Sequence, residues 1–159
     1  MQVLIIGGDC LNSNGHSIGK WISIIYRYAQ CYMTRELEPY NIGSGQFIFL
    51  GTLYREDGVH QETLAKKINI DKGTTARAIK KLEKEGYVVR KEDPEDRRAY
   101  KVFLTEKALE VKPEIFKILM NWTDILSKDL TRDEKEKVIE LLQRMSKNAA
   151  LFFKEKYEK

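Results

Sequence analysis

The basic side chains of residues 72–84, KGTTARAIKKLEK, are of the types that bind phosphate groups. The segment has helical periodicity, and a rotation of about 100° per residue divides its side chains between two faces. One face is apolar and comprises Thr75, Ala78, Ile79 and Leu82. The other face is small or basic and comprises Gly73, Ala76, Arg77, Lys80 and Lys84.

Small residues at the start of this helix would let its N-terminus approach a DNA major groove closely. Helix N-termini carry partial positive charge and free N–H groups, which favour phosphate. Arg77 is suited to a bidentate contact with guanine, and Thr74 or Thr75 to a phosphate or a thymine methyl group. The alternative interpretation is a solvated basic helix face. The predicted DNA contacts of this segment are Lys72, Gly73, Thr74, Thr75, Arg77 and Lys80.

A second charged segment, DPEDRRAY at residues 93–100, separates two short β-type runs, YVVRKE and AYKVFLT. This pattern predicts a hairpin with an exposed charged tip. Asp96 is followed by two arginines, Arg97 and Arg98. Its carboxylate can pair with the guanidinium of one of them and so hold that side chain extended. The segment then predicts that Arg98 enters a minor groove, with Asp96 as its orienting residue. The alternative is a network of surface ion pairs, which would contribute only about 0 to 1 kcal/mol to stability.

The positive charge of the chain is concentrated in this region. Residues 60–101 hold twelve Lys or Arg and eight Asp or Glu, an excess equal to the net charge of +4 of the whole chain. The positive and negative charges of the flanking segments therefore cancel. A locally basic region of this kind attracts polyanions.

The elements that must position these segments are mostly helical. Apolar residues at helical spacing predict a long helix from about 16 to 38, a second over 46–57 with Ser44 as N-cap, and a short third helix over 61–69. After the hairpin, a helix is predicted from 106 to about 127, with Pro113 breaking or kinking it. The capping box TRDE at 131–134 begins the last helix. The fold class is mainly α with a small β-hairpin wing, a winged helix-turn-helix.

One stretch of the sequence, TTARAIKKLEKEGYVVRKEDPEDRRAYKVFLT at residues 74–105, closely resembles the multiple antibiotic resistance regulator (MarR) family. The agreement in layout extends over about residues 16–157. The resemblance implies a homodimeric transcription factor, usually a repressor, that binds a pseudo-palindromic double-stranded DNA operator. Recognition helices would enter successive major grooves and wing arginines the minor grooves.

By position in the family pattern, Arg77 matches the recognition-helix arginine, and Asp96 and Arg98 match the D-x-R pair of the wing. Gly73 and Ala76 depart from the pattern, because relatives more often carry hydroxyl side chains there. Contacts from the side chains of those two positions are therefore not carried over.

Three segments with different roles are expected. Residues 1–15 form an N-terminal extension, residues 43–105 the DNA-binding winged helix-turn-helix, and residues 16–42 with 106–159 a helical dimerisation region. The apolar stripes of the first helix and the last two helices are too extensive for a small winged helix to cover, so we expect them to interlock across a two-fold axis. The alternative is that they pack on their own domain.

A small phenolic or aromatic anion is an expected effector, because relatives are often released from DNA by such ligands. Lys20, Trp21, Tyr26 and Arg27 offer cations beside rings, which suits an aromatic anion. The alternative is that the rings belong to the core and that the basic residues extend past them to solvent. Redox sensing through Cys31 or Cys10 is a further alternative, as is a winged helix that binds an acidic protein partner.

No catalytic or metal site is predicted. His16 and His60 have no Ser, Cys or carboxylate at triad or metal spacing and are expected to be surface or loop residues. The two cysteines lie in no C-x-x-C pair, so neither a disulfide framework nor a zinc site is indicated. No apolar stretch is long enough to cross a bilayer, so we expect a cytoplasmic protein. No cofactor is expected.

Overall fold

The computed structural model describes residues 17–94 and 99–157. The predicted extension at 1–15 and the wing-tip residues Asp96, Arg97 and Arg98 lie outside the described residues. The chain divides into two compact units, of which one ends at Lys112 and the other begins at Pro113. The predicted boundaries between segments of different role, at 42/43 and 105/106, remain predictions.

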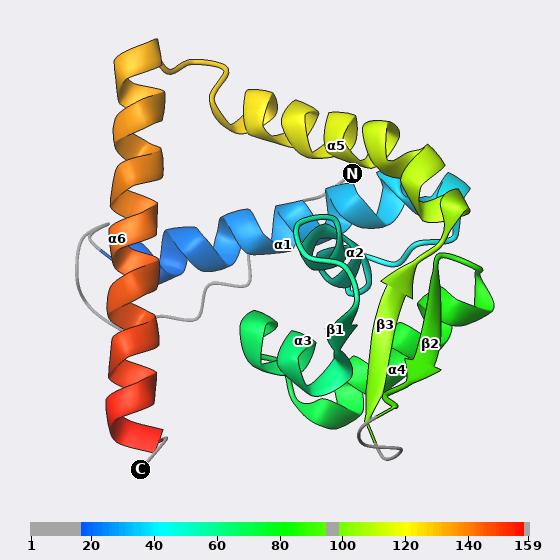
Figure 1. Cartoon of the computed structure of the whole chain (residues 1–159). Helices are drawn as coiled ribbons and strands as arrows, with labels where there is room; N and C mark the ends of the chain where they lie inside the picture. The colour runs from blue at the N-terminus through cyan, green and yellow to red at the C-terminus, as the bar shows by residue number, and fades with distance from the viewer. Residues whose placement is uncertain (1–16, 95–98, 158–159) are drawn as a thin grey trace. The chain divides into compact units, whose positions relative to one another are not determined.

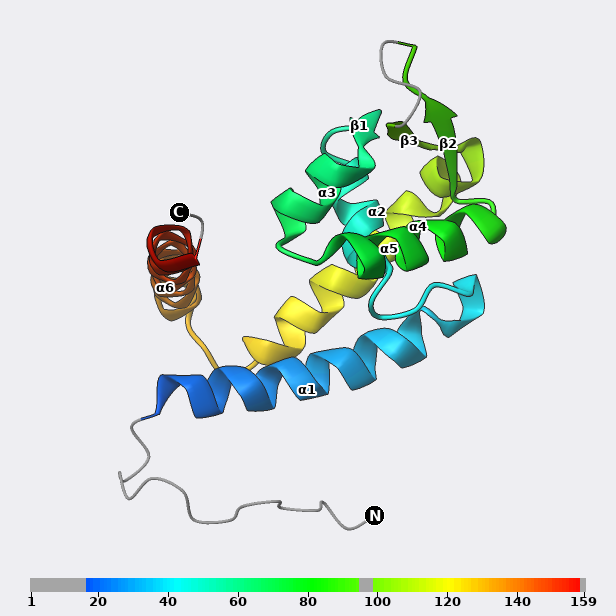
Figure 2. The same cartoon turned by 90° about the horizontal axis from the view of Figure 1, so that it is seen from below.

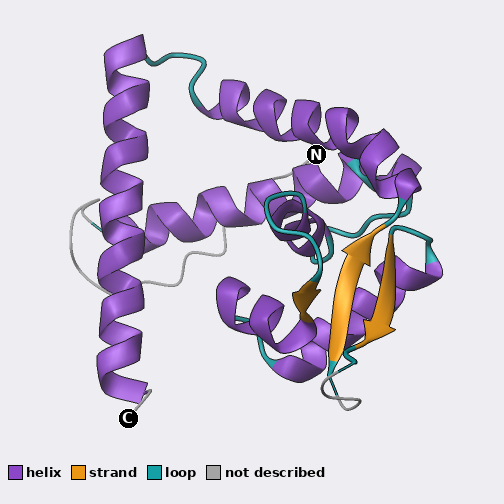
Figure 3. Cartoon of the chain, in the orientation of Figure 1, coloured by secondary structure: helices purple, strands orange, loops and turns teal. Residues whose placement is uncertain are grey.

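The described part is mainly helical with one small sheet, as the sequence predicts (Figures 1 and 3). Its elements in chain order are α1 (Ile18–Glu36), the 3-10 helix η1 (Glu38–Tyr40), α2 (Phe47–Leu53), β1 (Val59–His60), α3 (Gln61–Ile68), α4 (Lys72–Lys84), β2 (Val88–Glu92), β3 (Tyr100–Leu104), α5 (Glu106–Leu126) and α6 (Arg132–Tyr157).

The core of the first unit forms where α2, α3 and α4 meet. The large apolar side chains of Leu50, Leu64, Ile79 and Leu82 on the inner faces of these helices are each at most 1% exposed. Between α3 and α4 the chain turns at Asn69, which adopts a left-handed conformation with φ of 56°. Asparagine tolerates that conformation better than most residues, so the turn stays short and α4 follows α3 directly.

The sheet is antiparallel with the strand order β1–β3–β2. Figures 1 and 2 show β2 and β3 lying beside α4, and α4 contacts β2. The hairpin was predicted, but β1 was not, because two residues give no periodicity. Gly58 leads into β1 with φ of +70°, and a Cβ at this position would lie 2.7 Å from the Phe103 ring. Glycine therefore allows β1 to approach β3.

Of the two predicted helix caps, at Ser44 and at Thr131, only the second is present in the structure. Ser44 does not cap α2. The Gln46 side chain instead accepts a hydrogen bond of 2.6 Å from the Gly43 backbone N–H, one turn ahead of the helix. In the second unit the capping box is confirmed, because Thr131 N–H donates to Glu134 Oε2 at 2.8 Å and Glu134 N–H donates to Thr131 Oγ1 at 3.3 Å.

Pro113 does not break α5, which runs without interruption from Glu106 to Leu126. Proline lacks the N–H that would bond to the carbonyl four residues earlier. Beyond the proline, however, Ile115 and Ile118 are buried, at 2% and 7% exposure, and their burial favours continuation of the helix. Among the described residues, no helix combines the length and the apolar character that crossing a membrane requires.

Candidate nucleic-acid interface

The start of α4 is fixed by Asp71, the residue that precedes it. Asp71 Oδ1 accepts a hydrogen bond of 2.8 Å from the Thr74 backbone N–H and so caps the helix. This bond is the largest cause of the lowered pKa of the Asp71 carboxyl group. A Cβ at Gly73 would lie 3.3 Å from the same Oδ1, so glycine leaves space for the capping carboxylate.

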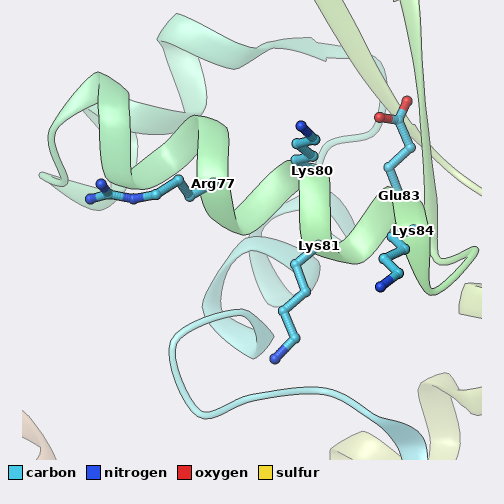
Figure 4. Close-up of a pocket in the computed structure, with 5 residues that line it drawn as sticks. All are labelled: Arg77, Lys80, Lys81, Glu83 and Lys84. Atoms are coloured by element: carbon cyan, nitrogen blue, oxygen red, sulfur yellow. The ribbon is translucent and has the colours of Figure 1, made fainter.

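The two faces of α4 predicted from the sequence are present in the structure. Its apolar face is buried in the first unit through Ala78, Ile79 and Leu82. Its other face is exposed, and a shallow groove of about 470 Å³ runs along it. Figure 4 shows the side chains that line this groove, which are Arg77, Lys80, Lys81, Glu83 and Lys84. Four of these five residues are cations.

Most predicted contacts on α4 lie on the accessible side. Lys72, Gly73, Arg77 and Lys80 are exposed and Thr74 is partly exposed. Arg77 Nη2 donates a hydrogen bond of 2.9 Å to Thr74 Oγ1, and Lys72 Nζ lies 2.7 Å from Glu62 Oε1 of α3. The structure therefore places Lys72, Thr74 and Arg77 around the first turns of the helix, close to its positive end.

Thr75 requires a correction. Its side chain is fully buried at 0% exposure, on the same face as Ala78 and Ile79, and its backbone N–H donates to Asp71 O within the helix. Its hydroxyl is therefore directed into the protein, and the predicted phosphate or thymine contact by this side chain is wrong. The helical rotation already assigns Thr75 to the apolar face, so that signal should have outweighed its residue type.

The base of the wing is held by a buried carboxylate that the sequence did not reveal. Asp93 is 5% exposed, and its Oδ2 lies 2.9 Å from Lys101 Nζ and 3.0 Å from His60 Nε2. Its backbone N–H also donates to Ala99 O at 2.9 Å. His60 was predicted to be a surface or loop residue; it is a partly exposed residue of a strand and has a carboxylate partner. The pair was missed because 33 positions separate the two residues and only the unpredicted β1 brings them together.

A second connection that the sequence did not reveal joins α4 to the wing. Arg90 of β2 donates hydrogen bonds from Nε and Nη2 to Glu83 Oε2 at 2.9 and 2.7 Å. These bonds are the main cause of the lowered pKa of Glu83 and of the raised pKa of Arg90. The candidate interface thus consists of a basic helix face and a hairpin attached to it.

The residues predicted to bind a ligand lie on α1 and are all exposed. Trp21 and Tyr26 are 53% and 61% exposed, so neither ring belongs to the core of a single chain. Lys20 Nζ lies 6.0 Å from the centroid of the Trp21 ring, and Arg27 Nη1 donates to Ser23 Oγ at 2.8 Å. The structure therefore brings together one predicted pair of a cation and a ring, Lys20 with Trp21. Cys31 is also exposed on α1.

Comparison with known proteins agrees with this arrangement. The family model described as "MarR family" matches residues 42–100, which contain α2 to β2 and end at the first residue of β3. An HTH-type transcriptional regulator of Bacillus subtilis, YybA, is 34% identical over 80% of this chain and 85% of its own length. A MarR transcriptional regulator from Methanosarcina mazei has a solved structure that is 50% identical, with a TM-score of 0.83 over 85% of this chain and 97% of that one.

The chain belongs to the MarR family. The predicted family and the winged helix-turn-helix fold are confirmed. The solved structure of a MarR family regulator from Listeria monocytogenes complexed with a 26mer DNA is also similar, at 29% identity and a TM-score of 0.79 over 88% of this chain and 95% of that one. MarR family regulators are DNA-binding transcriptional regulators and not enzymes. Within the described residues, no cluster of three or more His, Cys, Asp or Glu could hold a metal ion.

Proposed function

We propose that this MarR family regulator acts as a homodimeric repressor that binds a pseudo-palindromic operator sequence in double-stranded DNA. The observation that carries the proposal is the division of α4 into a buried apolar face and an exposed face whose groove is lined by Arg77, Lys80, Lys81 and Lys84. An exposed helix with a cationic outer face and an accessible N-terminus matches the shape and charge of a major groove.

Each part of α4 has a distinct role in the proposed complex. Arg77 reads a base edge, since its guanidinium is exposed and can form two parallel hydrogen bonds with guanine. Lys72 and Lys80 contact phosphates, which positions the helix without reading sequence. Gly73 and Thr74 let the N-terminal turn approach the backbone. In the wing, Asp96 orients Arg98 toward the minor groove, and Arg97 adds positive charge there.

Homodimer formation is supported by apolar side chains that a single chain leaves exposed. On α1, Ile22 and Ile25 are 46% and 44% exposed, and on α6, Val138 and Leu142 are 42% and 46% exposed. Apolar side chains exposed at helical spacing along a helix are typical of an interface. A second copy of the chain would cover these faces on both protomers and would set the spacing of the two α4 helices.

Release by a small aromatic anion completes the proposal. Lys20 and Trp21 on α1 offer a cation beside an exposed ring, and Tyr26 and Arg27 offer a second ring and a second cation on the same helix. A ligand bound there would lie on the helix that we assign to the dimer interface. It could therefore change the separation of the two DNA-reading helices and weaken binding to the operator.

The test is a titration of the purified protein against the DNA upstream of its own gene and against a scrambled duplex, at two salt concentrations. We expect tighter binding to the upstream DNA, with an affinity that falls steeply as salt rises. Sedimentation velocity should give the mass of two chains. Equal and weak binding to both duplexes would contradict operator recognition, and a monomer at micromolar concentration would contradict the dimer.

A further inference from the structure

Arg90 contacts α4 with both its side chain and its backbone. Its Nε and Nη2 atoms donate to Glu83 Oε2 at 2.9 and 2.7 Å, and its backbone N–H donates to Glu83 Oε1 at 3.3 Å. Both carboxylate oxygens of Glu83 are therefore engaged by one residue of β2. The two side chains are about one-third exposed, at 30% and 32%.

The same guanidinium also contacts β3. Its Cζ atom lies 5.6 Å from the centroid of the Tyr100 ring. In the register of the hairpin, Arg90 pairs with Val102 and Glu92 pairs with Tyr100, so Arg90 and Tyr100 are diagonal neighbours on one face. Arg90 thus lies between a carboxylate of α4 and a ring at the outer end of the wing. We call Glu83, Arg90 and Tyr100 the helix–wing clamp.

Glu83 is unusual in its surroundings. It is the one acidic residue in a groove otherwise lined by four cations, on the helix face that we assign to DNA. In Figure 4 its carboxylate points toward the strands, whereas Lys81 and Lys84 extend from the other side of α4. A carboxylate near DNA phosphates weakens binding by repulsion. Its hydrogen bonds with Arg90 lower its pKa, so it remains charged in the neutral range.

A contribution to folding stability is a weak explanation for the presence of the Glu83–Arg90 ion pair, because ion pairs exposed to this degree contribute little to the free energy of unfolding. Geometry is a stronger one. If α4 and the wing enter different grooves of one duplex, the angle between them must match the offset of those grooves. Two guanidinium donors on one oxygen of Glu83, with the backbone N–H of Arg90 on the other oxygen, fix orientation as well as distance.

We propose that Glu83 and Arg90 are positioning residues that fix the angle between α4 and the wing, so that both engage the DNA at once. This inference rests on the proposed function and extends it. Neither side chain needs to touch the DNA. Their effect is exerted through the residues of α4 and of the wing that do.

Glu83→Gln gives a test by sign. If Glu83 acts only through its charge, the substitution removes a repulsive carboxylate and tightens DNA binding. If it positions the wing, the substitution weakens binding, and we expect roughly a tenfold loss. The matched control is Glu85→Gln. It removes the same charge from a carboxylate that lies two residues further along the chain and outside the clamp, so DNA affinity should be unchanged or slightly higher.

Arg90 is tested by Arg90→Lys. A residue that contacts phosphate through charge alone would tolerate lysine. The clamp requires the planar guanidinium, so lysine should lose nearly as much affinity as Arg90→Gln. Glu83→Gln and Arg90→Gln together should lose no more than either alone, and the exchanged pair Glu83→Arg with Arg90→Glu should recover part of the loss.

The probe is a duplex that the wild-type protein selects from a random pool, and a random duplex of equal length measures non-specific binding. Hydrogen–deuterium exchange of residues 88–92 and 100–104 in the free protein gives a readout that needs no DNA. We expect faster exchange in Glu83→Gln and wild-type exchange in Glu85→Gln, with melting temperatures within a few degrees of each other.

Each outcome has a definite meaning. Tighter binding by Glu83→Gln, or wild-type affinity of Arg90→Lys, overturns the proposal while leaving DNA recognition intact. If the wild-type protein selects no sequence, the proposed function fails, and the exchange data decide whether the clamp orders the wing. Unchanged exchange in Glu83→Gln would then overturn the clamp as well.

Discussion

The Arg77 guanidinium donates a hydrogen bond of 2.9 Å to the hydroxyl group of Thr74, one turn earlier on α4. It therefore extends along the helix toward the N-terminal end, as Figure 4 shows. The bond is exposed, and bonds of this kind contribute only about 1 kcal/mol because water competes for both partners. Arg77 is thus held near the positive end of α4 by a bond that, in the proposed complex, it would exchange for a base edge.

Arg77→Ala should weaken binding to the selected duplex by roughly 1 to 3 kcal/mol and relax the base preference at one position. Its control is Lys80→Ala. That substitution should weaken binding to selected and random duplexes about equally and reduce the slope of affinity against salt by roughly one. Fluorescence anisotropy at several salt concentrations measures both effects. An equal loss on both duplexes for Arg77→Ala would remove its role in reading bases.

Thr75→Val tests the correction made for Thr75. The Thr75 hydroxyl is buried and has no hydrogen-bond partner among the described residues, and such a group costs stability. Valine has nearly the same shape without the hydroxyl. We expect the free energy of unfolding to stay the same or rise by up to about 1 kcal/mol, with DNA affinity unchanged. Weaker DNA binding by a stable Thr75→Val protein would show that the hydroxyl does contact DNA.

The local patterns of the sequence predicted helices and faces well. The apolar positions of residues 72–84 repeat with the helical period, so the buried face of α4 followed from counting. Thr131 and Glu134 stand three residues apart, the spacing at which one side chain reaches the backbone N–H of the other residue, and both bonds form. In each case the interacting groups lie within one or two helical turns.

Contacts between distant segments were not predictable in this way. The pairing of His60 with Asp93 depends on β1, a strand of two residues. The bond between Arg90 and Glu83 joins two elements across a turn, and Gly86 and the buried Tyr87 set the path of that turn. The sequence positions of these residues follow no helical or strand period that would predict the bond. Pro113 was predicted to break or kink the helix, and only the break is excluded, because α5 continues through it with Ile115 and Ile118 buried beyond it.

Gly86 should tolerate no side chain without cost. It ends α4 with φ of +77°, and Tyr87 N–H donates to Leu82 O at 2.9 Å as the chain turns into the wing. In Gly86→Ala the left-handed conformation should lower the free energy of unfolding by about 1 kcal/mol.

The control is Gly51→Ala, inside α2, where an added Cβ meets no atom within 4 Å. It should raise that free energy by about 0.5 to 1 kcal/mol, and urea unfolding would distinguish the two. A loss at Gly51 equal to that at Gly86 would contradict the conformational explanation.

Asp71 should make stability depend on acidity through the cap of α4. Its carboxyl pKa is lowered from the ordinary value of 3.8, chiefly by the hydrogen bond from the Thr74 backbone N–H. Because the folded-state pKa is the lower one, the carboxylate stabilises the fold at pH values above 3.8, and this contribution is lost as the pH falls through the folded-state pKa.

Asp71→Asn keeps an acceptor oxygen but has no charge to lose. We therefore expect the wild-type protein to exceed Asp71→Asn in free energy of unfolding at neutral pH, with the difference narrowing in acid, as measured by urea unfolding at several pH values. A difference that stays constant down to pH values well below 3.8 would show that the charge of Asp71 is not what stabilises the start of α4.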